Sequence, residues 1–207
     1  RDRILVSIAG AIEDEIVECL RRTQPLVAGI ELNISSPNTA GLRIFQEPGR
    51  LRGLIEGLVA DKQVPLFVKL PPWPRDTDNR HDILKLAETA VDAGADGLVI
   101  ANTHPIESHR LKVGRGGLSG APLFEHTELM IADIQALVQG NAAIIACGGV
   151  STAEQVWKLM ASGASAVQLY TSFIYEGPGL PSRLNRRLAK LMSVAGIETV
   201  ADITGPP

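Results

Sequence analysis

Short apolar runs alternate along the chain with longer segments whose apolar residues recur every three or four positions. The short runs predict β-strands, because aliphatic and β-branched residues without polar alternation are typical of strands buried on both faces. The longer segments predict amphipathic helices. The expected strands are residues 4–8, 29–34, 65–70, 97–102, 143–147 and 166–170, and the expected helices are residues 12–22, 50–61, 81–93, 125–138, 152–162 and 180–195.

This alternation of strand and helix predicts an α/β fold with a parallel sheet and right-handed crossovers. A doubly wound open sheet and a (β/α)8 TIM barrel both fit the pattern. An open sheet gathers its polar strand ends at one crevice, whereas a barrel collects them around one mouth. We predict the barrel, because polar residues or glycines mark nearly every strand end: Ser7, Asn33, Lys69, Asn102, Gly148 and Thr171.

The expected barrel is incomplete. A barrel of this kind has eight strands and about 250 residues, whereas this chain has 207 residues and six expected strands. We therefore expect residues 1–207 to form one N-terminally incomplete barrel domain with about six of the eight βα units, belonging to a longer protein. Such an opened sheet would expose apolar edges that further units cover.

Composition and charge limit the classes of partner. Hydrophobic residues make up 45% of the chain, enough for a sizeable core, and the formal net charge is −3. Without a basic cluster, the chain has no signature of binding to nucleic acid or to an anionic membrane surface. No apolar run is long enough to span a bilayer, which predicts a cytoplasmic protein. Cys19 and Cys147 are expected to be buried free thiols.

The polar residues after the strand 29–34 form the first candidate site. Asn33 interrupts an apolar strand, and Pro37 ends strand pairing because it lacks a backbone donor. An ordinary capped turn would account for such a segment on its own. Its expected position at the same mouth as Lys69 and Asn102 favours a binding or catalytic site instead. The polar side chains projecting there are Ser35, Ser36, Asn38 and Thr39.

Two loops near the end of the chain predict a phosphate site. Gly148 and Gly149 follow the strand 143–147, and Tyr170 and Thr171 follow the strand 166–170. The loops after the last two strands of a TIM barrel commonly cradle phosphate with their backbone N–H groups. A double glycine also occurs in plain turns. The second loop and the helix expected at residue 152 favour phosphate binding.

Other polar residues give weaker signals. Lys69 lies in an apolar strand, where an ammonium needs a partner, and we favour an anionic ligand over a structural ion pair. The glycine-rich residues 114–122 are expected to form a flexible lid. The histidines show no metal-binding spacing and are expected at the surface, with His104 near the mouth: His81, His104, His109 and His126. We predict no metal site.

Six ordered motifs resemble the C-terminal two-thirds of the dihydroorotate dehydrogenase family. They are residues 33–43 (NISSPNTAGLR), 68–69 (VK), 102–103 (NT), 116–123 (GGLSGAPL), 148–150 (GGV) and 168–171 (QLYT). The resemblance implies an FMN-dependent barrel that oxidises dihydroorotate to orotate in pyrimidine biosynthesis. A serine at position 36 is similar to the quinone-using class, so the resemblance also implies a quinone acceptor and peripheral contact with the inner membrane through N-terminal elements.

The resemblance assigns roles by position. Ser36 matches the catalytic base, and Thr39 matches the residue that relays its proton. The expected substrate-binding residues are Asn33, Asn38, Asn102 and Thr103, and the expected FMN-binding residues are Ser7, Asn33, Lys69, Ala101, Gly120, Gly148, Gly149, Tyr170 and Thr171.

Three positions depart from the quinone-using pattern. Ser7 stands where that class usually has Asn, Ala101 replaces the usual Thr, and residues 70–74 replace an Ala-Pro-Asp continuation. Two alternatives therefore stay open. The first is a related FMN oxidoreductase that acts on another cyclic substrate, and the second is a phosphate-binding barrel fragment without redox chemistry.

Overall fold

The computed structural model describes residues 3–35, 41–73, 80–203 and 205. The chain divides into two compact units. The first unit comprises residues 1–102 and 137–143, and the second comprises residues 103–136 and 144–207.

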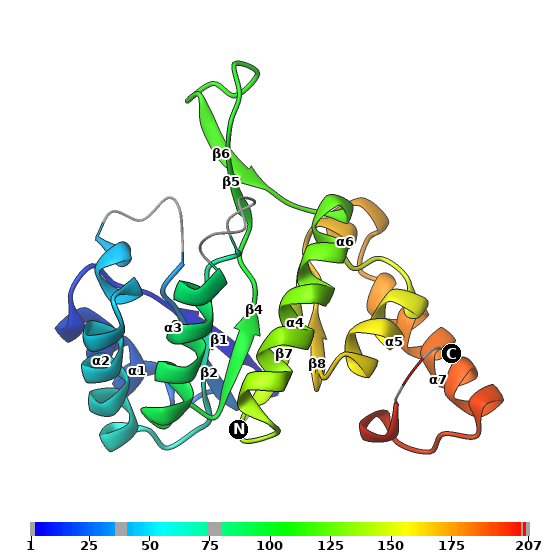
Figure 1. Ribbon diagram of the computed structural model, residues 1–207, viewed down its shortest axis with the longest axis horizontal. Coiled ribbons are helices and arrows are strands. Elements are labelled where there is room, and N and C mark those ends of the chain that lie inside the picture. Colours follow the sequence, from blue (N-terminus) through cyan, green and yellow to red (C-terminus); the bar gives the residue numbers. More distant parts are fainter. Residues whose placement is uncertain (1–2, 36–40, 74–79, 204, 206–207) are drawn as a thin grey trace. The chain divides into compact units, whose positions relative to one another are not determined.

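The first unit is a parallel sheet with connecting helices (Figure 1). Its strands β1 (Leu5–Ile8), β2 (Gly29–Asn33), β3 (Leu66–Lys69) and β4 (Gly97–Ile100) pair as parallel neighbours in chain order. The helices are α1 (Glu13–Thr23), α2 (Pro48–Asp61) and α3 (Arg80–Asp92), and a 3-10 helix, η1 (Leu42–Gln46), precedes α2.

The core of this unit follows from the apolar pattern. All four residues of β4 are buried, and β2 is buried except at Asn33. The helices turn one apolar stripe inward at three- and four-residue spacing, for example Leu51, Leu54, Ile55 and Leu58 of α2. At the outer edge, Ile4 and Leu5 are 49% and 48% exposed.

The second unit contains both parallel and antiparallel strands. β5 (His104–Glu107) and β6 (Arg115–Leu118) form an antiparallel hairpin. β7 (Ala143–Cys147) begins in the first unit and pairs in parallel with β8 (Ala166–Gln168). The helices are α4 (Phe124–Val138), α5 (Ala153–Ala161), α6 (Thr171–Glu176) and α7 (Leu180–Ala195), and the 3-10 helices are η3 (Ala121–Leu123) and η4 (Val200–Asp202).

The six strands and six helices expected from the sequence are confirmed, with ends shifted by one or two residues. The β5–β6 hairpin, the helix α6 and the short 3-10 helices were not expected. The β5–β6 hairpin occupies part of the stretch expected to be a flexible lid, so that expectation is wrong for β6. The short helix α6 follows β8 directly. Within the described part of the chain, no helix has the length and apolar character needed to cross a membrane.

Candidate functional site

The carboxyl ends of the parallel strands in the first unit carry a group of polar side chains, which we call the strand-end cluster. Strand pairing places Ser7 beside Glu31 and Asn33 beside Lys69. Because side chains alternate between the two faces of a strand, Glu31 and Asn33 lie on one face. The members of the cluster are Ser7, Glu31, Asn33, Ser35, Lys69 and Asn102.

Three of these residues form a network of amide and hydroxyl groups. The Asn102 Nδ2 donates to Ser35 Oγ at 3.0 Å and approaches Asn33 Oδ1 at 3.5 Å. Asn33 Oδ1 also accepts from the Ser35 backbone N–H at 3.0 Å and from Ser35 Oγ at 3.1 Å. Ser35 is buried. The network fixes two carboxamides, which supply donors and acceptors suited to a planar ligand with amide groups.

The charged half of the cluster is an ion pair between β2 and β3. Lys69 Nζ lies 3.5 Å from Glu31 Oε1, and the two side chains are 16% and 8% exposed. Ser7 Oγ donates to the same Glu31 oxygen at 2.8 Å. Lys69 was expected to face an anionic ligand rather than a structural ion pair, and the structure shows the ion pair with Glu31. Glu31 was missed, although it interrupts an apolar strand just as Lys69 does, and that signal could have identified it.

The segment that carries the expected base is flanked on one side by the described residues Ile34 and Ser35 and on the other by the residues from Gly41 onward. Ser36, Asn38 and Thr39 fall outside the described residues. Before the segment, Ser35 belongs to the strand-end cluster. After it, Gln46 Nε2 donates to the Ile34 carbonyl at 2.9 Å. Ile34 and Ser35, the last two described residues before the segment, are therefore both held at the carboxyl end of β2.

Two further expected site residues flank Asn102. Ala101 is buried and follows a cis peptide bond from Ile100. Thr103 belongs to the second unit, where it packs on the β5–β6 hairpin. A Cβ atom added at Gly117 would lie 2.2 Å from Thr103 Oγ1, so the glycine lets the two segments approach closely.

Three loops of the second unit meet in what we call the glycine-loop cluster, formed by residues 119–120, 148–150 and 170–172. Thr171 Oγ1 donates to Ser119 Oγ at 3.1 Å, and Ser172 Oγ donates to the Val150 carbonyl at 2.6 Å. A Cβ atom at Gly120 would lie 3.0 Å from Thr171 Cγ2. The structure thus brings together five residues expected to bind cofactor: Gly120, Gly148, Gly149, Tyr170 and Thr171.

The glycines of this cluster are required by backbone geometry. Gly149 has a φ of 80°, and a Cβ atom there would lie 2.3 Å from the Phe124 backbone nitrogen. Gly148 has a φ of 140°, and its Cβ atom would lie 2.7 Å from Thr127 Oγ1. The loop after β7 therefore packs directly against the start of α4, which any side chain would prevent.

The helix termini near these loops differ in what they offer an anion. At the start of α5, the Gln155 side chain accepts from the backbone N–H groups of Ser151 and Thr152, and Thr152 accepts from that of Gln155. This capping box occupies donors that we expected to face a phosphate. By contrast, α6 begins at Thr171 without a side-chain cap. Barrels commonly bind phosphate at a short extra helix in this place.

The histidines only partly follow the expectation. His81 and His109 are exposed, but His104 is 5% exposed, so its placement at the surface was wrong. Its ring contacts that of His126 edge-on, with centroids 4.3 Å apart, because β5 begins beside α4. Cys19 and Cys147 are free and only partly buried. Over residues 3–35, 41–73, 80–203 and 205, no group of three or more potential ligands could hold a metal ion.

The chain is similar to dihydroorotate dehydrogenases over most of its length. The sequence model of the family described as dihydroorotate dehydrogenase matches residues 1–192. The dihydroorotate dehydrogenase (quinone) of Sphingopyxis alaskensis is 38% identical over 190 residues, covering 87% of this chain and 52% of that protein. The mitochondrial enzyme of Oryza sativa is 36% identical over 188 residues, covering 84% of this chain and 39% of that protein.

A solved structure agrees with these relatives. The DHODH of Eimeria tenella in complex with ferulenol superposes with a TM-score of 0.82 at 32% identity, covering 93% of this chain and 57% of that one. This likeness confirms the predicted α/β barrel class. The chain spans 52% and 39% of the length of the two relatives above, about half or less. On these matches, the chain belongs to the dihydroorotate dehydrogenase family.

Proposed function

We propose that the protein containing this chain uses FMN to oxidise (S)-dihydroorotate to orotate in pyrimidine biosynthesis and passes the electrons to a quinone. Membership of the family supports the reaction. The observation that carries the proposal is the strand-end cluster, where two hydrogen-bonded carboxamides and a lysine occupy neighbouring strand ends of one barrel mouth. A barrel places its catalytic groups at these ends.

The residues present fit FMN. Glycines with positive φ let the backbone of the glycine-loop cluster approach a phosphate closely, and α6 offers an uncapped helix start. The phosphate and ribityl chain would be held by Gly120, Gly148, Gly149, Tyr170 and Thr171, and the flavin ring by Ser7, Asn33, Lys69 and Ala101. FMN bound there would supply a hydride acceptor for C6 of the substrate and a carrier of both electrons to the quinone.

The substrate would be held mainly by amide side chains. Asn33 and Asn102 are fixed through Ser35, so their orientation is set before the substrate arrives. Preorganised donors and acceptors lose little entropy on binding. Asn38 and Thr103 would complete the contacts with the orotate ring and its carboxylate.

Ser36 would remove the C5 proton of the substrate while the hydride leaves C6. A serine hydroxyl is a weak base at its ordinary pKa, so it needs an acceptor for its own proton. Thr39, three residues further along the same segment, would pass that proton outward. Ser36 directly follows Ile34 and Ser35, which are held by hydrogen bonds with Gln46 and Asn33, and this supports the placement of the base beside the amide network.

The test is anaerobic mixing of the protein, at its natural length and loaded with FMN, with dihydroorotate while flavin bleaching is recorded. We expect rapid bleaching that slows by about 10²–10⁴ in Ser36→Ala, the usual contribution of a positioned base. Ser36→Cys should retain part of the rate, and Ser193→Ala, on the exposed side of α7, should behave as wild type. Equal rates in wild type and Ser36→Ala would contradict the role of Ser36.

The same experiment separates the alternatives. Bound flavin that neither bleaches with dihydroorotate nor changes its absorption band with orotate would indicate an FMN oxidoreductase with another substrate. Absence of flavin at natural length would indicate a phosphate-binding barrel without redox chemistry. A quinone acceptor implies peripheral contact with the membrane that carries it, which we propose is made by parts of the protein outside residues 1–207.

A further inference from the structure

We propose that Glu31 is a positioning residue that restrains the ammonium of Lys69 and offsets its charge, and thereby lowers the reduction potential of the bound flavin. This inference rests on the proposed function, in which Lys69 lies beside the flavin ring. Glu31 is not among the residues that the family resemblance assigned. Its role follows from the contacts of the strand-end cluster.

The burial of the pair makes Glu31 significant. The side chains of Glu31 and Lys69 are 8% and 16% exposed, whereas the exposed pair of Arg21 and Asp61 has side-chain exposures of 59% and 38%. Charges withdrawn from water interact more strongly because the surrounding dielectric constant is lower. A carboxylate 3.5 Å from the Lys69 ammonium therefore acts on it far more than a surface carboxylate would.

Glu31 is held in place independently of Lys69. Ser7 Oγ donates to Glu31 Oε1 at 2.8 Å, the length of a full hydrogen bond. The distance of 3.5 Å between Glu31 Oε1 and Lys69 Nζ is longer than that of a charge-assisted hydrogen bond. The carboxylate is thus anchored on β1, and it attracts the lysine from a fixed point.

Strand register explains how these groups meet. Ser7 pairs with Glu31 across β1 and β2, and Asn33 pairs with Lys69 across β2 and β3. Side chains two residues apart share a face of a strand, so Glu31 lies directly behind Asn33. The backbone of Glu31 therefore lies one layer deeper along the strands than those of Asn33 and Lys69, and its side chain reaches the Lys69 ammonium from there.

The effect on the flavin follows from charge. Reduction places negative charge on the flavin, which a nearby ammonium stabilises and a nearby carboxylate destabilises. With Glu31 present, the ammonium is partly neutralised and is held toward β2. Removing the carboxylate should favour the reduced flavin, and removing the ammonium should favour the oxidised one.

The test measures the midpoint potential of FMN bound to the protein at its natural length, together with FMN affinity. We expect Glu31→Gln to raise the potential and Lys69→Met to lower it. Glu31→Asp, which keeps the charge but shortens the side chain, should give a smaller rise and serves if Glu31→Gln does not fold. Asp61→Asn removes a carboxylate from the exposed pair with Arg21 and should leave the potential unchanged.

The double variant tests whether Glu31 acts through Lys69. We expect the shift caused by Glu31→Gln to shrink to less than half in the Lys69→Met background. An equal shift in both backgrounds, an unshifted potential with FMN bound normally, or a lowered potential would each overturn the inference alone. Wild-type protein that binds no FMN would instead overturn the proposed function, and this inference with it.

Discussion

The strand-end cluster of the first unit and the glycine-loop cluster of the second unit are built by different means. In the strand-end cluster, side chains hold one another: Asn102 contacts Ser35, and Glu31 contacts Lys69. In the glycine-loop cluster, close backbone approach decides the geometry, and a Cβ atom at Gly149 would lie 2.3 Å from Phe124 N. One region depends on the side chains that are present, and the other on side chains that are absent.

This difference has a functional meaning. A ligand that must be distinguished by its ring substituents needs directional side-chain donors and acceptors, and one of these can be removed without changing the path of the backbone. A phosphate can be held by backbone N–H groups, which require a particular chain path. Substitutions should therefore affect substrate recognition selectively in the first region and folding together with cofactor binding in the second.

The largest expected effect is that of Gly149→Ala. Left-handed backbone costs a residue with a Cβ atom about 1–2 kcal/mol, and overpacking adds about 1–3 kcal/mol. We expect the free energy of unfolding to fall by about 2–5 kcal/mol and FMN binding to be lost. The matched control is Gly140→Ala, which has a similar φ of 82° but no atom within 4 Å of its Cβ position. Denaturant titration of both variants would contradict this account if their losses were equal.

A selective loss of substrate affinity is expected from Asn102→Ala. The change leaves Ser35 without the donated bond of 3.0 Å and removes a direct contact with the substrate. Loss of that contact leaves a polar group of the substrate unpaired in the site, which costs about 1–3 kcal/mol, so orotate affinity should fall about 10- to 100-fold while FMN stays bound. Asn141→Ala, at an exposed position before β7, is the control and should change neither affinity. Calorimetric titration with orotate measures the effect.

Thr171→Val should produce a smaller effect with the opposite selectivity. It removes the hydroxyl that donates to Ser119 at 3.1 Å beside the expected phosphate position. One hydrogen bond is worth about 1 kcal/mol, so FMN affinity should fall about fivefold and orotate affinity should not change. Thr199→Val, at an exposed turn where the hydroxyl bonds Asp202, serves as control. If Thr171→Val weakened orotate binding at saturating FMN, the assignment of cofactor binding to the glycine-loop cluster and of substrate binding to the strand-end cluster would be contradicted.

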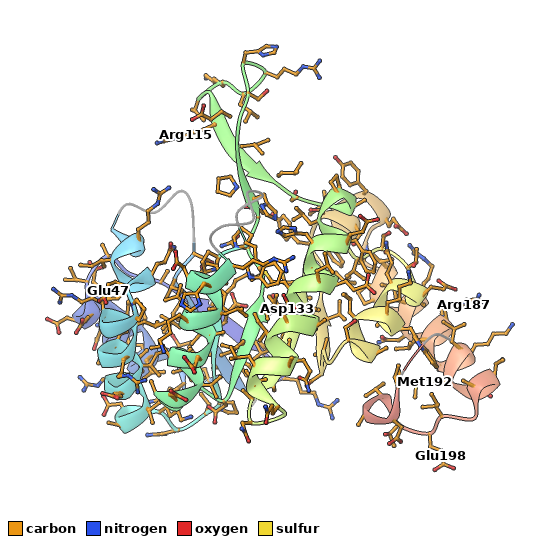
Figure 2. The ribbon with its side chains drawn as sticks, in the orientation of Figure 1. Glu47, Arg115, Asp133, Arg187, Met192 and Glu198 are labelled. Atoms are coloured by element: carbon orange, nitrogen blue, oxygen red, sulfur yellow. The ribbon has the colours of Figure 1, made fainter. Side chains whose placement is uncertain are left out.

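The smallest effect is expected at Glu47, which lies outside both clusters at the start of α2 (Figure 2). The backbone N–H groups of Gly49 and Arg50 donate to its carboxylate and hold its pKa below the ordinary value. A lowered pKa in the folded state stabilises the protein above the unfolded pKa, and this contribution is lost as the pH falls through the folded one.

Glu47→Gln should therefore lower the thermal midpoint slightly at pH 7. The difference should shrink as the pH falls below the ordinary glutamate pKa of about 4.3 and disappear below the lowered pKa of the folded state. Glu198→Gln, at an exposed position after α7, is the control. A difference that grows as the pH is lowered would contradict the assigned sign.

The sequence predicted the parallel strands well because their composition leaves little choice. Runs such as Gly97–Ile100 are apolar throughout and flanked by helical patterns. This composition is typical of strands buried on both faces of a parallel sheet, which predicts the α/β barrel. The β5–β6 hairpin was missed because Pro105, Gly116 and Gly117 have low strand propensity. The two strands are stabilised by their pairing with each other, which the sequence pattern does not show. The helix α6 was missed because six residues are too few to show a helical period.

The candidate site was predicted where a polar residue interrupts an apolar strand. The strand-end cluster brings together Asn33, Lys69 and Asn102, because the carboxyl ends of parallel strands lie at the same edge of the sheet. Partners across strands could not be predicted in the same way, because the contact between Glu31 and Lys69 depends on register, which a single sequence does not show. His104 was wrongly placed at the surface for a similar reason, since its burial depends on α4.

The most direct measurement of the central claim is a two-ligand titration of the protein at its natural length. FMN is added first, and orotate is then added while the flavin absorption band is recorded for wild type, Asn102→Ala and Thr171→Val. The account predicts that Asn102→Ala needs about 10- to 100-fold more orotate for the change but binds FMN as wild type does. It predicts that Thr171→Val binds FMN more weakly but keeps the orotate response of wild type. The reverse assignment, or an equal loss of both ligands in both variants, would contradict it.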